Sequence, residues 1–304
     1  MSGSRLPRRF RFGPFRTWIC FIKPPLVSDR IVSSAGTRSG PSVPWPRFGP
    51  VAIRRPADRV PAVIPDHSTH EVAMEFVLPP KETPWFPVAD GSSRFPVRRI
   101  FCVGRNYAAH AREMGNDPDR EPPFFFMKPA DAVVHDAEIV AYPPETRELH
   151  FEAELVVALG LGGRNIETDQ ALDHVWGYAA GNDLTRRDLQ ATAKKLGRPW
   201  DLAKGFDRSA VIGAIHPVDQ VGHLETGQIT LTVDGALRQE GDLGDMIWSV
   251  PEIIAILSRS VVLEPGDLIM TGTPAGVGAI TPGETCVVTI DGLSPLTTPI
   301  GPLD

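Results

Sequence analysis

The stretch HFEAELVVALG, residues 150–160, carries the sharpest local signal in the sequence. Its unbroken apolar run at residues 155–159 has the length of a buried β-strand. Side chains alternate between the two faces of a strand, so Glu152 and Glu154 share one face, with His150 beside them. Two such carboxylates repel each other unless a cation lies between them, and a hard divalent ion is the simplest candidate. A solvated strand face is the plainer alternative.

A third carboxylate follows the next apolar run of the chain. Residues 175–180 are expected to form a strand, and Asp183 lies in the sequence GNDLT just after it. Taken alone, an Asp at such a junction is more often a turn or cap residue than a ligand. If Asp183 converges with Glu152 and Glu154, the three fit Mg²⁺ or Mn²⁺. Zinc fits less well, because no cluster of Cys and His has zinc-ligand spacing.

A candidate acid–base pair lies upstream, in the sequence GRNYAAHAREMG at residues 104–115. A helix is expected at residues 106–114, closed by Gly115. His110 and Glu113 are three residues apart on this helix and can touch. A carboxylate that holds an imidazole gives a general base able to activate water near neutral pH. A surface His–Glu pair is the alternative.

Two lysines and one loop have unusual settings. Lys128 follows FFFM and precedes a proline, and Lys204 lies in LAKGFD. Such lysines either reach the surface along an apolar stem or bind an anionic substrate. The sequence TGTPAGVG at residues 271–278 is a Gly-rich turn without the ending of a phosphate loop. It is either a plain turn or a loop that offers N–H groups and the Thr273 hydroxyl to a substrate.

The remaining pattern predicts many short strands and few helices. This pattern favours a β-rich α+β domain over a βαβ series. The further strands are expected at residues 99–103, 124–127, 229–233, 268–271 and 286–290, and the further helices at residues 186–196 and 251–258.

Composition and charge exclude several classes of protein. The chain has 304 residues, 42% of them hydrophobic, and a net charge of −6. That charge argues against a general nucleic-acid binder, and no apolar run approaches the roughly 18 residues of a membrane helix. The three cysteines are too scattered for a disulfide framework or a zinc knuckle. We therefore expect a protein of a reducing compartment, the cytoplasm, with neither nucleic acid nor membrane as partner.

The N-terminal segment differs from the rest. Residues 1–73 hold 12 Lys and Arg against 4 Asp and Glu, and 11 of the 31 prolines. Because their apolar residues follow no period, we expect a disordered Arg/Pro-rich extension. A basic arm, an organellar transit peptide and a true translation start at Met74 compete as explanations. We favour the start at Met74, where ordinary protein composition begins, and expect residues 74–304 to form a single catalytic domain.

Seven motifs follow one another along the sequence, namely GRNYAAHAREMG, FFFMKPADAVV, LHFEAELVVALG, GYAAGNDLTRRDLQ, RPWDLAKGFDRSA, DMIWSVPEIIAILS and LEPGDLIMTGTPAGVG. In this order they resemble the fumarylacetoacetate hydrolase family over about residues 100–300. Within it, the runs REPPFFF and GRPWDLAKGFDRSA are similar to the acylpyruvase-type branch, and there to the members that cleave fumarylpyruvate in gentisate degradation. The resemblance implies a mixed β-roll of the family's C-terminal type, with a few short helices and usually a homodimer.

The resemblance also implies a role for each matching residue. His110 and Glu113 would be the water-activating pair. Thr273 would bind the substrate carboxylate, and Lys128 would lie near the site. The metal ligands for Mg²⁺ or Mn²⁺ would be Glu152, Glu154 and Asp183. The positions that contact the substrate or its enolate would be Lys204, Gln190 and Arg187, with Arg105 or Arg187 as the cation that reads a second carboxylate.

The activity implied is metal-dependent hydrolysis of a C–C bond in a 2,4-dioxo acid. For fumarylpyruvate, the products would be fumarate and pyruvate. The same scaffold can cleave other acylpyruvates, decarboxylate oxaloacetate, or hydrate or isomerise a related oxo acid. A non-catalytic binder of dicarboxylates is a different kind of interpretation, and a general base argues against it, because binding alone needs none.

Overall fold

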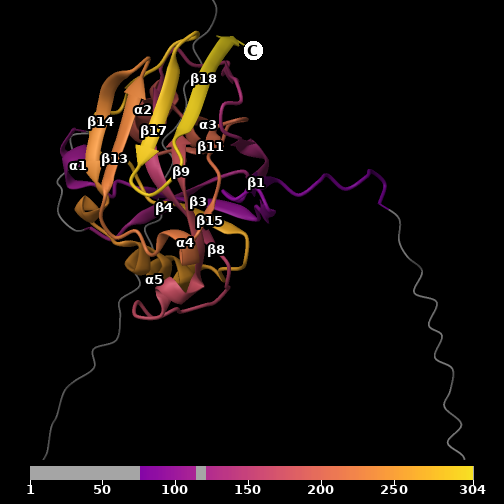
Figure 1. The fold of residues 1–304 in the computed structure, drawn as a ribbon. Coiled ribbons are helices and arrows are strands. Elements are labelled where there is room, and N and C mark those ends of the chain that lie inside the picture. Colours follow the sequence, from indigo (N-terminus) through magenta and orange to yellow (C-terminus); the bar gives the residue numbers. More distant parts are fainter. Residues whose placement is uncertain (1–75, 114–120, 304) are drawn as a thin grey trace, which may run out of the picture. The chain divides into compact units, whose positions relative to one another are not determined.

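The computed structural model of the protein describes residues 76–113 and 121–303 and, within them, all side chains except those of residues 111–113 (Figure 1). The expectations for residues 1–73 and for the helix end at Gly115 lie outside this part. No helix in the described ranges is both long and apolar enough to cross a membrane.

The described chain contains four sheets, five α-helices and three short 3-10 helices, which confirms the predicted β-rich α+β class (Figure 1). The α-helices are α1 (Ala108–Glu113), α2 (Arg187–Leu196), α3 (Asp201–Lys204), α4 (Val218–Val221) and α5 (Val250–Ser260).

The largest sheet has eight strands of mixed direction. Strand β8 runs antiparallel to both β15 and β9, whereas β15 is parallel to β3. In spatial order the strands are β4 (Phe124–Lys128), β3 (Arg99–Gly104), β15 (Asp267–Met270), β8 (Ala153–Leu159), β9 (Val175–Asp183), β11 (Ala210–Ile212) and β5 (Val133–Val134), with β12 (His216–Pro217) also paired to β9.

Three smaller sheets complete the described part. The five-stranded sheet contains β14 (Ala236–Asp242), β13 (Gln228–Val233), β17 (Thr285–Ile290), β18 (Leu296–Leu303) and β6 (Val140–Tyr142). The three-stranded sheet contains β10 (Thr185–Arg186), β7 (Leu149–Phe151) and β16 (Gly278–Ala279), and the two-stranded sheet contains β1 (Trp85–Pro87) and β2 (Arg94–Pro96).

Strand β8 is buried on both faces. Leu155 and Val157 pack into one apolar cluster, and Val156 and Ala158 pack into a second cluster across the sheet. A strand covered on both sides has no polar face, which is why its sequence is a continuous apolar run rather than an alternation. The polar residues before this run therefore lie where the strand leaves the core.

The register between β8 and β9 brings the acidic residues together. Glu154 lies opposite Gly181. Residues that face each other across an antiparallel pair point to the same side of the sheet, and so does Asp183, two residues beyond Gly181. A side chain at Gly181 would not fit, because its Cβ would lie 2.6 Å from Cγ2 of Val156.

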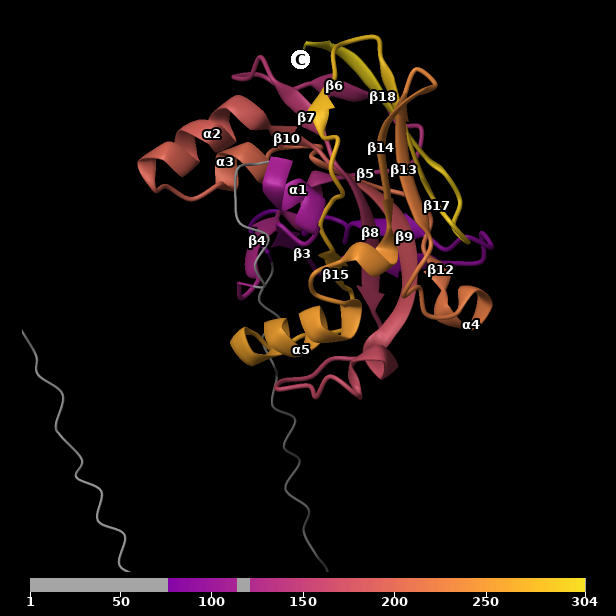
Figure 2. The same ribbon diagram turned by 90° about the vertical axis from the view of Figure 1, so that its left-hand side faces the viewer.

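Helix α2 brings further polar side chains to the same place. It ends at Gly197, which adopts the left-handed conformation with φ 62° and donates its N–H back to the last turn. Arg187 and Gln190, three residues apart, are its buried residues. Figure 2 shows α1, α2 and α3 gathered beside strands β3 and β4.

Candidate active site

Three buried carboxylates meet where β8 begins and β9 ends. Glu152 and Glu154 come from the first of these strand ends, and Asp183 is the last residue of β9. One oxygen of each carboxylate lies within 4.8 Å of one oxygen of the others, and the residues are at most 4% exposed. Neither a solvated strand face nor a simple turn cap describes such a cluster.

Two buried lysines contact the cluster. Nζ of Lys204 donates to Oε2 of Glu152 and to Oδ2 of Asp183, both at 2.7 Å. Nζ of Lys128 lies 2.7 Å from Oδ1 of Asp183 and donates to the carbonyl oxygens of Leu184 and Lys204. Both lysines are at most 2% exposed, so neither reaches the surface along its stem.

These contacts shift the pKa values of the paired groups. Burial by itself lowers the pKa of Lys204, but the charges of Asp183 and Glu152 outweigh burial and raise that pKa. Burial raises the pKa of Glu152, but Lys204, Arg187 and His110 together hold it below the usual glutamate value. The ammonium and this carboxylate are therefore both charged at neutral pH.

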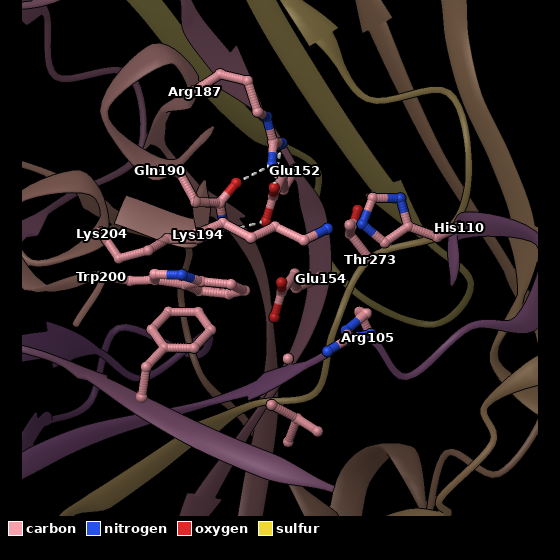
Figure 3. A pocket seen from close by; sticks show the side chains of 13 residues that line it. Arg105, His110, Glu152, Glu154, Arg187, Gln190, Lys194, Trp200, Lys204 and Thr273 are labelled. Carbon is pink, nitrogen blue, oxygen red and sulfur yellow. Dashed lines mark hydrogen bonds and ion pairs between the residues drawn. The ribbon is translucent and has the colours of Figure 1, made fainter. Parts of the chain in front are cut away.

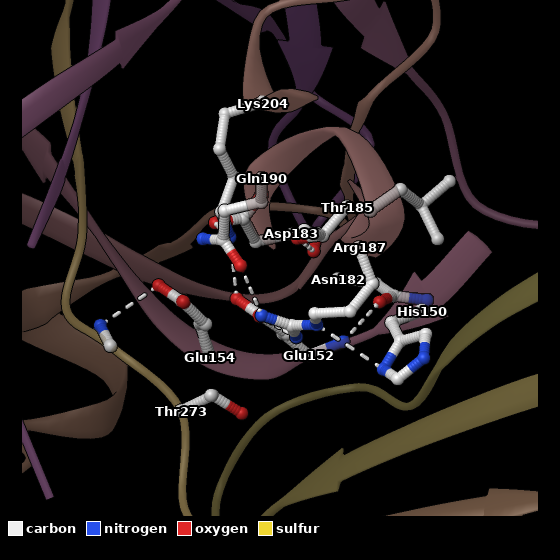
Figure 4. A network of polar contacts seen from close by, with 12 residues as sticks. His150, Glu152, Glu154, Asn182, Asp183, Thr185, Arg187, Gln190, Lys204 and Thr273 are labelled. Carbon is white, nitrogen blue, oxygen red and sulfur yellow. Dashed lines mark hydrogen bonds and ion pairs between the residues drawn. The ribbon is translucent and has the colours of Figure 1, made fainter. Parts of the chain in front are cut away.

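Helix α2 adds a third cation and an amide. The Arg187 guanidinium donates to Oε1 of Glu152, to Oε1 of Gln190 at 2.6 Å and to Nδ1 of His150 at 3.3 Å (Figure 4). Gln190 lies one helical turn from Arg187, which is why the two side chains meet. Arg187 thus holds the Glu152 carboxylate in place, in addition to facing the cavity described below.

Glu154 is the carboxylate of the cluster with no cation of its own. Its Oε2 accepts the Gly272 N–H at 2.8 Å, and it forms no ion pair with any residue of the described ranges. Burial and the charges of Asp183 and Glu152 raise the pKa of Glu154 well above the ordinary value of 4.5. Three converging carboxylates, one of them uncompensated, are the donor set that a hard divalent cation prefers.

Glu154→Gln should stabilise the metal-free protein by about 1–3 kcal/mol at pH 7.5, because it removes a buried carboxylate that has no cation. The pKa of this carboxyl group is higher in the folded protein than its ordinary value of 4.5 in the unfolded chain. The group therefore destabilises the fold increasingly as the pH rises above 4.5. The gain should therefore vanish below that pH. Urea unfolding in EDTA measures it, with Glu148→Gln, an exposed position, as control.

A loss of stability in the Glu154→Gln variant at neutral pH would contradict this account of the cluster. The variant should also lose the rise in melting temperature that Mn²⁺ gives the unchanged protein, because one of the three ligands no longer carries charge.

A cavity opens above the carboxylates (Figure 3). His110 of α1, which is 6% exposed, and Thr273 of the Gly-rich loop both line it. Lys128 and Asp183, which contact each other, do not line the cavity, and the side chain of Glu113 is outside the described part. The cavity thus brings together eight of the residues predicted from the sequence, namely Arg105, His110, Glu152, Glu154, Arg187, Gln190, Lys204 and Thr273.

Gln239 of β14 fixes the polarity of the Thr273 hydroxyl. Its Oε1 accepts the Ala153 N–H at 2.9 Å, and its Nε2 donates to the Pro274 carbonyl at 2.9 Å and to Oγ1 of Thr273 at 2.8 Å. A backbone N–H can only donate and a carbonyl can only accept, so the amide has one orientation. Oγ1 therefore accepts from Gln239, and its own hydrogen is available to donate elsewhere.

Sequence reasoning missed Gln239 and Lys194. Gln239 lies 34 residues from Thr273, and no local pattern marks a strand glutamine as a partner of that loop. Lys194 lines the cavity from the last turn of α2. A signal for Lys194 was present, because it lies seven residues after Arg187 and four after Gln190, on one helical face.

Comparison with known proteins gives a consistent set of similarities. Residues 99–301 match the family described as Fumarylacetoacetate (FAA) hydrolase C-terminal. A fumarylpyruvate hydrolase from Pseudomonas aeruginosa, crystallised with Mn²⁺ and pyruvate, has a similar structure, with a TM-score of 0.74 and 51% sequence identity. The similarity covers 76% of this chain and 100% of that one.

Two curated relatives carry different names. A fumarylpyruvate hydrolase from a Ralstonia species is 42% identical over 193 residues, which cover 63% of this chain and 100% of the relative. A mitochondrial oxaloacetate decarboxylase from Dictyostelium discoideum is 41% identical over 197 residues, which cover 64% of this chain and 90% of the relative. Sequence similarity alone therefore does not separate the two reactions.

Proposed function

This chain belongs to the fumarylacetoacetate hydrolase family, and we propose that it hydrolyses the C3–C4 bond of a 2,4-dioxo acid, with fumarylpyruvate as substrate and fumarate and pyruvate as products. The observation that carries the proposal is the buried cluster of Glu152, Glu154 and Asp183 under a cavity that also holds His110. The similarity to a fumarylpyruvate hydrolase with bound Mn²⁺ and pyruvate supports it.

Glu152, Glu154 and Asp183 would hold the divalent ion, Mg²⁺ or Mn²⁺. When bound, such an ion supplies Lewis-acid chemistry at the 2-oxo acid end of the substrate. Its positive charge would also offset the repulsion between the Glu154 carboxylate and the carboxylates of Glu152 and Asp183. Lys204 contacts only the latter two. The residues present therefore fit the ion.

His110 would act as the general base. Its imidazole takes a proton from water, and the resulting hydroxide adds to the C4 carbonyl carbon. The C3–C4 bond then breaks, with its electron pair passing to the enolate of pyruvate. The protonated His110 returns its proton to C3, which gives pyruvate, and the acyl group leaves as a carboxylic acid that ionises by releasing one proton to solvent. Water is the only co-reactant, and all atoms balance.

Lys204 would stabilise the enolate. Its ammonium is already fixed by two carboxylates and stays charged, because these raise its pKa. It lines the cavity, so the charge that develops on the substrate meets a cation that needs no reorganisation. The Thr273 hydroxyl, which accepts from Gln239, would donate its own hydrogen to the C1 carboxylate of the substrate.

Metal removal tests the proposal. Excess EDTA should abolish the release of pyruvate from fumarylpyruvate, and Mg²⁺ or Mn²⁺ added above the chelator should restore it, because the carboxylate cluster then regains its cation. A coupled assay for pyruvate measures both steps. Unchanged turnover in excess EDTA would contradict the metal-dependent mechanism.

Oxaloacetate decarboxylation is a second candidate, favoured by the 41% identity to the Dictyostelium discoideum decarboxylase. That reaction also produces a pyruvate enolate, so the carboxylate cluster and Lys204 would serve it equally. It needs no attack by water, however, and His110 would then have no proton to remove from water. The effect of removing His110 therefore separates the two candidates.

A further inference from the structure

The cavity above the carboxylates adjoins a wider hollow with an aromatic wall. The hollow has a volume of about 540 Å³ and shares Phe126 and Trp200 with the cavity. The Trp200 ring meets the Phe124 ring edge-on, with 5.2 Å between their centroids. The centroids of the Trp200 and Phe126 rings are 6.0 Å apart. These rings are only partly buried, so they offer apolar surface to a flat group that extends from the cavity.

Lys194 and Arg105 are the two cavity cations that are not engaged with a carboxylate. Lys204 and Arg187 are paired with the cluster, whereas neither Lys194 nor Arg105 forms an ion pair within the described ranges. The Arg105 guanidinium lies over the Phe124 ring, 5.1 Å from its centroid. Of these two cations, Arg105 therefore lies against an aromatic ring, whereas Lys194 has no charged or aromatic partner in the described ranges.

The helical repeat directs Lys194 into the cavity. It follows Arg187 by seven residues, close to two turns of α2, and shares the face of Arg187 and Gln190. Figure 3 shows its side chain extending from α2 into the space between the carboxylates and His110. Its neighbour Lys195 does not line the cavity and points about 100° away around the helix.

We propose that Lys194 binds a second carboxylate, at the end of the substrate's acyl group, while Phe126 and Trp200, which line the same cavity, contact the flat chain that leads to it. This inference rests on the proposed function and names its substrate class, a 2,4-dioxo acid with a planar, unsaturated acyl group ending in a carboxylate. A lysine suits this role because its ammonium is a compact charge on a flexible stem. An acetyl group carries no second carboxylate for Lys194 to bind.

A matched pair of variants tests the role of Lys194. Lys194→Met should lower kcat/KM for fumarylpyruvate by about ten- to a hundred-fold, the range expected for a lost charge-assisted hydrogen bond. It should leave kcat/KM for acetylpyruvate, which lacks the second carboxylate, within about twofold, since no bond of that strength is lost. Lys195→Met should change neither value, although both lysines lie in the last turn of α2.

A binding measurement keeps this test separate from the proposed function. Crotonate has a methyl group where fumarate has its second carboxylate. Calorimetry measures the affinity of each compound for the Mn²⁺-loaded protein. Lys194→Met should weaken the binding of fumarate but not the binding of crotonate. If the unchanged protein cleaves no acylpyruvate, the proposed function fails, and fumarate binding still decides the role of Lys194.

Three results would overturn the inference. The first is an equal effect of Lys194→Met on the two acylpyruvates or on the two binding probes. The second is a loss of kcat/KM for fumarylpyruvate in Lys195→Met as large as the loss in Lys194→Met, which would indicate a general effect of helix charge. The third is no binding of fumarate to the unchanged Mn²⁺-loaded protein.

Discussion

His110→Ala should lower kcat for fumarylpyruvate hydrolysis by about 10²- to 10⁴-fold, the usual contribution of a positioned general base. KM should change little, because the substrate contacts proposed for Lys204, Thr273 and Lys194 remain. Steady-state kinetics measures both constants. Calorimetry with Mn²⁺ should show that the carboxylate cluster still binds metal.

The control for this variant is His174→Ala. His174 lies outside the cavity and contacts the Leu161 carbonyl at the surface. Its removal should leave turnover unchanged. If His110→Ala has normal turnover, His110 is not the base. If it loses hydrolysis of acylpyruvates but keeps decarboxylation of oxaloacetate, the water-activating role is supported.

Lys204→Met should affect both stability and turnover. Lys204 lies between Glu152 and Asp183, and its removal leaves two buried carboxylates without the cation between them. Breaking a buried ion pair in this way costs about 3–5 kcal/mol. Turnover at saturating metal should fall by about 10²- to 10³-fold, because the enolate loses a preorganised cation.

Added Mn²⁺ should restore part of the stability that Lys204→Met loses, because a divalent ion replaces the missing positive charge. Turnover should not return with it, since no ammonium faces the enolate. Urea unfolding with and without Mn²⁺ measures the first effect and kcat the second, with Lys195→Met as control. Unchanged stability and turnover in Lys204→Met would contradict the role given to this lysine.

The local pattern of the sequence predicted much of the fold and the carboxylates. The apolar run of residues 155–159 became the centre of β8, and alternation placed Glu152 and Glu154 correctly on one face. The predicted helix at residues 106–114 begins later, at Ala108. Asn106 does not join it, because its side chain bonds the backbone of Trp248 and Thr271.

The partners of the carboxylates depend on contacts that no local pattern encodes. Lys128 reaches Asp183 from β4, 55 residues earlier in the chain, and Lys204 reaches it from the end of α3. When the register of β9 and the position of α3 are unknown, a lysine beside an apolar run is predicted more readily to reach the surface. The same limit applies to Gln239, whose partners lie on two other segments.

The assignment of the three carboxylates, His110 and Lys204 to one hydrolytic site depends on the reaction itself. The full chain with Mg²⁺ should convert fumarylpyruvate to equal amounts of fumarate and pyruvate, with a higher kcat/KM than for acetylpyruvate or oxaloacetate. In water labelled with ¹⁸O, the fumarate should carry the label in the carboxylate formed from C4. Release of CO₂ from oxaloacetate with no cleavage of fumarylpyruvate would contradict the account.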